Sequence, residues 1–214
     1  MLEDSKLKEE IISSERLYTG SILSLDLAQA RLPDGSIAPR EIVRHRGAVA
    51  VVPVDEIGCV TLVRQWRAPI GRITLEIPAG KLEPGEEDRA AAAVRELEEE
   101  TGLRAARWQE LTCLDTTPGF SDEKITVYLA TSLTSHSAHT DPDEFLDVIR
   151  MPLEMAVSKV MNGGITDGKT VAGLLMAQKR LSAQEQAPLF TSVPIQRSKD
   201  AYSSLQAEKT SKTQ

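Results

Sequence analysis

The sequence predicts an α/β protein in which a small antiparallel β region precedes a larger domain of strands and helices. Three observations lead to this prediction. Short strand-like runs fill residues 10–45, two apolar runs follow at 47–54 and 59–66, and an alanine-rich helical segment occupies residues 88–101. A chain of 214 residues is long enough for one sizeable domain with an accessory piece, or for two small domains.

Residues 1–45 are expected to form the small antiparallel domain. Strand-like runs cover Arg16–Tyr18, Ser21–Arg31 and Glu41–His45. The sequence Pro-Asp-Gly-Ser at Pro33–Ser36 is typical of a turn, so we expect a hairpin here.

The larger domain is expected to span residues 46–181. Its apolar runs 47–54 and 59–66 predict a second hairpin, buried on both faces, around the turn Asp55–Gly58. Thr74–Pro78 predicts a short strand that ends at proline. Periodicity further predicts strands at 107–115, 124–131 and 146–150, and helices at 153–162 and 170–181.

The clearest helix prediction is Asp88–Thr101. Four alanines favour a helix, acidic residues precede it where the helix dipole suits them, and Gly102 stands where a helix usually stops. Leu97 and Val94 are expected to anchor this helix in the core.

Composition limits the classes of function. The 25 basic and 32 acidic residues give a net charge of −7, which argues against a nucleic-acid-binding surface. We expect no membrane span and no signal peptide, because the chain lacks a long apolar run and its first residues are charged. Cys59 and Cys113 are interpreted as buried free thiols of a cytoplasmic protein, with a disulfide as the less favoured alternative. Residues 182–214 are polar and are interpreted as a C-terminal tail.

Three glutamates share one face of the predicted helix. With Glu96 at zero, Glu99 lies at about 300° and Glu100 at about 40° around the axis. Carboxylates at these spacings repel one another, and the C-terminal turns of a helix disfavour anions. A divalent cation reverses both effects, and hard oxygen ligands suit Mg²⁺, with Mn²⁺ as an alternative. A bare run of glutamates is more often a solvated helix face than a metal site. The residues around it are therefore needed to choose between these two interpretations.

The residues around the helix favour the metal interpretation. Gly80 and Gly85 bracket a turn that contains Pro84, and this turn would bring backbone carbonyls close to the helix. Arg95 can pair with Glu99 four residues later and fix its rotamer.

The segment Gly80–Leu103 resembles the Nudix box, which is the signature of hydrolases of nucleoside diphosphates linked to another group. The family pattern is G-x5-E-x7-R-E-U-x-E-E-x-G-U, where U is aliphatic. Its second half matches residue by residue at Arg95, Glu96, Leu97, Glu99, Glu100, Gly102 and Leu103. The resemblance implies an α/β/α sandwich with a mixed sheet.

The first half of the box departs from the pattern by one residue. Five residues separate Gly80 from Glu86, but eight then separate Glu86 from Arg95. Counting back from Arg95 gives Glu87 as the box glutamate instead. The spacing to the helix favours Glu87, and the choice between Glu86 and Glu87 stays open.

Flanking segments resemble the ADP-ribose pyrophosphatase branch of the family. They are Leu62–Arg67, Leu75–Gly80 and Pro118–Glu123. Guanidinium groups suit phosphate oxygens, although Arg64 is equally well an edge-strand charge, and Trp66 is interpreted as a core or dimer contact. The resemblance implies substrate-binding roles for Arg64, Arg67, Glu76, Gly80, Phe120 and Ser121.

The resemblance also implies a mechanism. Divalent metal would be held by Glu96, Glu100, the Ala79 carbonyl and Glu99, the last directly or through water. A glutamate on a loop after the box would position the attacking water, and we choose Glu144, with Asp143 as the reserve. The implied catalytic residues are therefore Glu144, Glu99 and Arg95.

Members of this branch are typically homodimers whose N-terminal sheet helps to build the partner's site. The expected ligand is a small nucleoside diphosphate derivative, and the expected products of ADP-ribose are AMP and ribose 5-phosphate. Two alternatives remain: a pyrophosphatase for other nucleotide sugars or dinucleotides, and a regulator that binds ADP-ribose without turnover.

Overall fold

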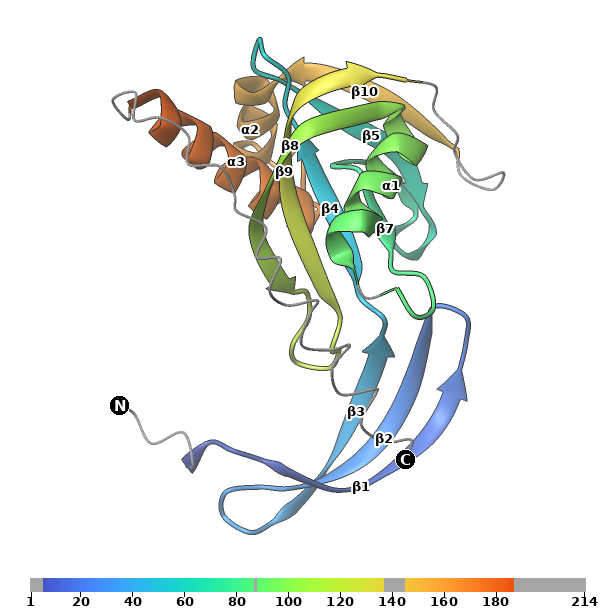
Figure 1. Cartoon of the computed structure of the whole chain (residues 1–214). Helices are drawn as coiled ribbons and strands as arrows, with labels where there is room; N and C mark the ends of the chain where they lie inside the picture. Colours follow the sequence, from blue (N-terminus) through green and yellow to red (C-terminus); the bar gives the residue numbers. More distant parts are fainter. Residues whose placement is uncertain (1–5, 87, 137–144, 187–214) are drawn as a thin grey trace, which may run out of the picture. The chain divides into compact units, whose positions relative to one another are not determined.

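The computed structural model describes residues 6–86, 88–136 and 145–186. The described residues up to Leu181 belong to one compact unit. Ten strands and three α-helices are described, in the order β1 Glu10–Thr19, β2 Leu23–Arg31, β3 Ile37–His45, β4 Ala48–Pro53, β5 Cys59–Arg67, β6 Arg72–Glu76, β7 Ala79–Lys81, α1 Arg89–Thr101, β8 Leu103–Asp115, β9 Lys124–Ser135, β10 Leu146–Pro152, α2 Leu153–Met161 and α3 Gly168–Gln186 (Figure 1).

The N-terminal strands form the predicted antiparallel sheet, in the order β1-β2-β3. The predicted turn is confirmed: Gly35 adopts a φ of 86°, and the Ser36 amide donates to the Asp34 carboxylate at 2.9 Å. Asp26 is buried on β2 and is paired with Arg16 on β1 and Arg44 on β3. This ion-pair cluster links all three strands of the sheet.

The second predicted hairpin is wrong. Strands β4 and β5 share a single bridge, Val54 with Val60, and then diverge into different sheets. Strand β4 pairs in parallel with β9 and antiparallel with β7, while β5 lies between β10 and β6. Both strands are apolar enough to be central in a sheet, so each is surrounded by neighbours from distant parts of the chain instead of pairing with the other.

Helices cover the mixed sheet β7-β4-β9-β8 on its two faces, which confirms the α/β/α sandwich (Figure 1). Side chains of β4 alternate between the faces, as the two-residue period of a strand requires. Val49 and Val51 pack with Leu97 of α1. Ala50 and Val52 pack on the other face with a cluster that includes residues of α2 and α3.

Helix α1 begins and ends where the sequence predicts. The carboxylate of Asp88 accepts hydrogen bonds from the amides of Ala90 and Ala91, which is an N-cap. Gly102 adopts a left-handed conformation with a φ of 66° and closes the C-terminus. Leu97 is fully buried as predicted, but Val94 is 42% exposed, so its predicted core role is wrong. Ala92 and Ala93 lie against the sheet in its place.

Two further predictions need correction. Helix α3 continues to Gln186, five residues beyond the predicted end at 181, through a sequence without glycine or proline. Both cysteines are free, but Cys59, at the first position of β5, is only partly buried, and Cys113 is exposed because alternate side chains of the edge strand β8 point away from the core. Among the described helices, none has the length and apolar character needed to cross a bilayer.

Candidate active site

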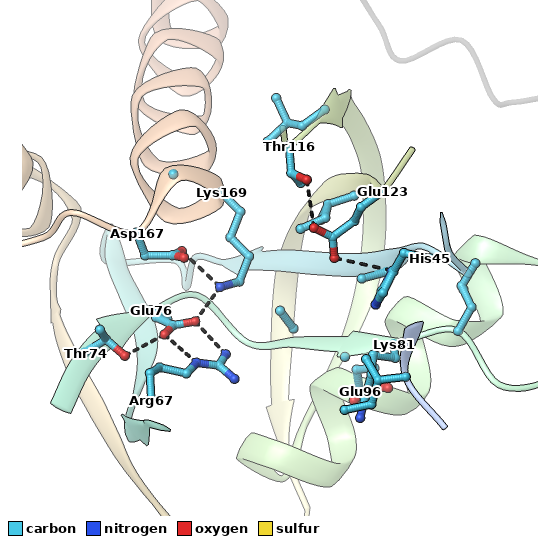
Figure 2. A pocket seen from close by; sticks show the side chains of 18 of the residues that line it. His45, Arg67, Thr74, Glu76, Lys81, Glu96, Thr116, Glu123, Asp167 and Lys169 are labelled. Carbon is cyan, nitrogen blue, oxygen red and sulfur yellow. Dashed lines mark hydrogen bonds and ion pairs between the residues drawn. The ribbon is translucent and has the colours of Figure 1, made fainter. Parts of the chain in front are cut away.

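A cavity of about 1170 Å³ opens beside the C-terminal half of α1. Its wall is built from strands β5 to β7, helix α1, the end of β3 and the start of α3. Charged side chains in the lining include Arg67, Glu76, Glu96, Asp167 and Lys169 (Figure 2). Glu100 also lines the cavity. The volume is sufficient for a nucleotide-sized ligand.

Gly80 and Glu96 are in close approach at the base of this cavity. A Cβ atom placed on Gly80 would lie 1.9–2.1 Å from the carboxylate atoms of Glu96. No real side chain tolerates such distances, so the carboxylate can occupy this place only because residue 80 is glycine. Strand β7, which carries Gly80, thus brings its backbone against the face of α1.

Glu100 is fixed one turn further along α1. It is 3% exposed, and its carboxylate accepts a hydrogen bond of 3.0 Å from the Ala79 amide. Burial of an ionisable carboxylate is costly unless hydrogen bonds or cations compensate for lost hydration. The Ala79 amide therefore holds Glu100 at the cavity wall, and Gly80, which has no side chain, leaves room for Glu96 beside it.

Arg95 connects the glutamates of the box. Its Nη1 donates to Glu96 at 2.8 Å and to Glu99 at 2.9 Å, which confirms the predicted i,i+4 pair. Its Nη2 donates to Glu86 at 3.2 Å. Burial lowers the pKa of Arg95, but the carboxylates of Glu96 and Glu99 outweigh this and raise it. Arg95 is therefore a permanent cation among three carboxylates.

These carboxylates fit a divalent cation of the magnesium type. In the described ranges, no three His, Cys, Asp or Glu side chains form a complete metal site. Magnesium does not need one, because it is usually held by one or two carboxylates, water and the phosphates of a substrate. Glu96 and Glu100 line the cavity with hard oxygen atoms and match that requirement.

Glu76 forms the second charged centre of the cavity. Its side chain is 2% exposed, and Arg67 donates to its two oxygens through Nε and Nη2 at 2.8 Å each. Thr74 donates at 2.6 Å and Lys169 forms a further short ion pair (Figure 2). Burial alone raises the pKa of Glu76, but hydrogen bonds from Arg67 and the nearby ammonium of Lys169 lower it to about 2.

Sequence reasoning missed Lys169 and Asp167. The sequence predicts a helix at 170–181 and assigns no role to Asp167, although an aspartate just before a helix is a capping signal. The Asp167 carboxylate accepts from the Thr170 amide at 3.0 Å and caps α3. Nothing in the sequence places Lys169 beside Glu76, because 93 positions separate them.

Three predicted substrate-binding residues lie outside the lining of this cavity. Arg64 is exposed and pairs with Asp147 at 3.4 Å. Phe120 is 55% exposed, and its carbonyl accepts a 2.7 Å hydrogen bond from the Val43 amide. Ser121 forms an isolated bridge with Val43. Phe120 and Ser121 thus join the N-terminal sheet to the larger domain in this chain.

The remaining predicted site residues differ in where they lie relative to the cavity. Glu99 faces Arg95 and does not line the cavity, whereas Ala79, Gly80 and Arg95 do. Glu86 lies within reach of Arg95. Glu87, Glu144 and the reserve Asp143 lie outside the described residues.

Comparison with known proteins agrees with this arrangement. A match to the NUDIX domain spans residues 44–172. An ADP-ribose pyrophosphatase of Bacillus subtilis is 40% identical over 182 residues, which cover 84% of this chain and 98% of that protein. An ADP-ribose pyrophosphatase of Mycobacterium tuberculosis is 44% identical over 168 residues, covering 78% of this chain and 81% of that protein.

A solved structure described as an ADP compounds hydrolase has the same fold. Its TM-score is 0.73 at 23% identity, and the match covers 84% of this chain and 97% of that one. The glutamates on α1, the close approach of Gly80 to Glu96 and the extent of the domain match lead to one conclusion. This chain belongs to the Nudix family.

Proposed function

We propose that this protein hydrolyses the diphosphate of ADP-ribose to AMP and ribose 5-phosphate, with Mg²⁺ as its metal. Two relatives of at least 40% identity, matched over most of their length, are ADP-ribose pyrophosphatases. The resemblance of Leu62–Arg67 and Pro118–Glu123 to that branch of the family supports the same substrate.

One observation carries the proposal. The Glu96 carboxylate lies against the Gly80 backbone, and Glu100 is fixed by the Ala79 amide, in a cavity that the Arg67 guanidinium also lines. Paired carboxylates suit a hard cation, and a guanidinium suits a phosphate. A diphosphate between them would meet both kinds of group.

The metal would be held by Glu96, Glu100 and the Ala79 carbonyl, and Glu99, which faces Arg95, would act through water. When bound, it would neutralise the diphosphate and lower the pKa of a coordinated water. Arg95 restrains the carboxylates of Glu96 and Glu99 in place through its two hydrogen bonds from Nη1. Arg67 would bind a phosphate oxygen and keep the diphosphate oriented for in-line attack.

Glu144 is proposed to accept the proton of the attacking water, with Asp143 as the reserve. For Glu144→Gln we expect a large loss of kcat while metal affinity is unchanged. An unchanged kcat would move this role to another residue.

The N-terminal sheet, residues 1–45, is proposed as the homodimerisation domain, residues 46–181 as the catalytic domain and 182–214 as a tail. Large apolar side chains are exposed on β1, including Leu17 at 52% and Tyr18 at 57%. Exposed apolar groups on a sheet favour burial against another surface. A cytoplasmic location fits a free-thiol protein with a nucleotide substrate.

The direct test is product identification. Purified protein is incubated with ADP-ribose, several nucleotide sugars and dinucleotides, with Mg²⁺, with Mn²⁺ or with EDTA. We expect AMP and ribose 5-phosphate from ADP-ribose, the highest kcat/KM in that reaction, and no turnover in EDTA. Faster turnover of another substrate would reassign the specificity, and binding without turnover would indicate a regulator.

A further inference from the structure

A compact cluster of four charged groups joins β5, β6 and the start of α3. The Lys169 ammonium lies between two carboxylates: it forms a short ion pair with Glu76 and a 3.0 Å contact with Asp167 (Figure 2). Its side chain is only 10% exposed. Arg67 completes the cluster from the other side of Glu76. The formal charges of the four side chains cancel.

Asp167 cannot easily move in this cluster. Its carboxylate accepts hydrogen bonds from the amide and hydroxyl of Thr170, at 3.0 and 2.5 Å, and so caps α3. The Thr170 hydroxyl oxygen in turn accepts a 3.0 Å hydrogen bond from the Ile77 amide, directly after β6. Thr170 is fully buried. The start of α3 is thereby tied to the strand that carries Glu76.

Arg67 is more accessible than Lys169, because its side chain is 40% exposed and lines the cavity. Its Nε and Nη2 atoms are engaged by Glu76, which fixes the plane of the guanidinium. In a side-on pair of this kind the Nη1 group points away from the carboxylate and remains the donor that a cavity ligand can reach. Anything that moves Glu76 therefore moves the phosphate-binding group.

We propose that Lys169 is a positioning residue for Arg67, acting through Glu76. This inference rests on the proposed function, because it assigns to Lys169 the orientation of the arginine that receives the diphosphate. The ammonium separates the Glu76 and Asp167 carboxylates and attracts both. Without it, the two carboxylates repel, and Glu76 yields because Asp167 is held by the helix cap. Arg67 then loses the orientation in which it meets a phosphate.

The first test uses Lys169→Met, Lys169→Arg and the control Lys179→Met, a substitution at an exposed lysine of the same helix. A small misplacement of a positioning group is worth about 100-fold in rate, so we expect kcat/KM for ADP-ribose to fall about 100-fold in Lys169→Met. The loss should appear more in KM than in kcat, because a binding contact is weakened. Lys169→Arg should restore part of the activity, and Lys179→Met should match wild type.

The second test is a double-mutant cycle with Arg67→Met. If Lys169 acts through Arg67, then Lys169→Met has little further effect on kcat/KM in the Arg67→Met background. An equal loss in both backgrounds would overturn the inference, since it would mean that Lys169 contacts the substrate independently. Circular dichroism and thermal melting confirm that each variant is folded.

A binding measurement separates this inference from the proposed function. Calorimetric titration of ADP-ribose in EDTA reports affinity without turnover, and Lys169→Met should bind more weakly than wild type. Equal affinities would overturn the role of Lys169. If wild-type protein binds ADP-ribose but does not cleave it with any metal, the proposed function is refuted. The difference in affinity between wild type and Lys169→Met would still test the role of Lys169.

Discussion

The two charged centres of the cavity differ in how their charges are balanced. On α1, the carboxylates of Glu86, Glu96 and Glu99 share the guanidinium of one arginine, Arg95. At the other centre, the single carboxylate of Glu76 receives four donors from Arg67, Thr74 and Lys169. The first centre has an excess of negative charge that suits a divalent cation, whereas the second is neutralised within the protein and suits a rigid support.

The largest effect that follows from this comparison concerns the α1 centre. Removing the charge of one cavity-facing carboxylate, in Glu96→Gln or separately in Glu100→Gln, should lower kcat about 1,000-fold, because charge stabilisation of the transition state is lost. AMP release from ADP-ribose with Mg²⁺ measures it. Near-normal turnover by both folded variants would show that α1 is not the metal site.

The next largest effect concerns the backbone of Gly80, which lies beside Glu96. In Gly80→Ala, the added methyl group would lie about 2 Å from the Glu96 carboxylate, so the carboxylate or strand β7 must move. We expect kcat to fall about 100-fold. The control Gly85→Ala lies in the turn after β7, with nothing within 4 Å of its Cβ position, and its φ of 83° makes it report backbone strain without a contact to Glu96. An equal loss in both variants would trace the effect to general strain in the segment between β7 and α1.

The third effect belongs to the Glu76 centre and concerns stability. The pKa of Glu76 is lowered from its ordinary 4.5 to about 2, so folding favours the ionised form. This contribution, about 3 kcal/mol, is complete above pH 4.5 and is lost as pH falls towards 2. Glu76→Gln should therefore unfold more easily than wild type at pH 7, and the difference should narrow below pH 4.5.

Urea unfolding at a series of pH values measures this difference. A constant difference between wild type and Glu76→Gln from pH 7 to pH 3 would contradict the assigned ionisation. The control variant is Asp147→Asn, at an exposed carboxylate.

The smallest effect tests a residue that lies at neither centre. Arg64 makes an exposed ion pair with Asp147, and such pairs contribute about 1 kcal/mol or less. Arg64→Ala should change the free energy of unfolding by no more than that, and it should leave kcat/KM near wild type, because Arg64 lies outside the cavity lining. A large loss of activity, measured together with the molecular mass in solution, would place Arg64 in a site shared by two subunits.

Local spacing explains which features of the molecule could be predicted. The glutamates of α1 share a face because three or four residues make one helical turn, and Asp88 and Gly102 mark the ends of that helix through local hydrogen bonds. The apolar runs also predict where several strands lie. They do not predict which strands pair, because β4 and β5 are adjacent in sequence yet lie in different sheets.

The sequence by itself determined the family, the helix with its carboxylate face and the two glycines, Gly80 and Gly102, that its geometry requires. Tertiary structure alone decided that Arg67, Glu76 and Lys169 meet, and that Arg64 stays outside the cavity lining. The physical reason is distance along the chain. Helix caps and helix faces depend on residues a few positions apart, whereas an ion pair such as Glu76–Lys169 forms only after two sheets and α3 have packed.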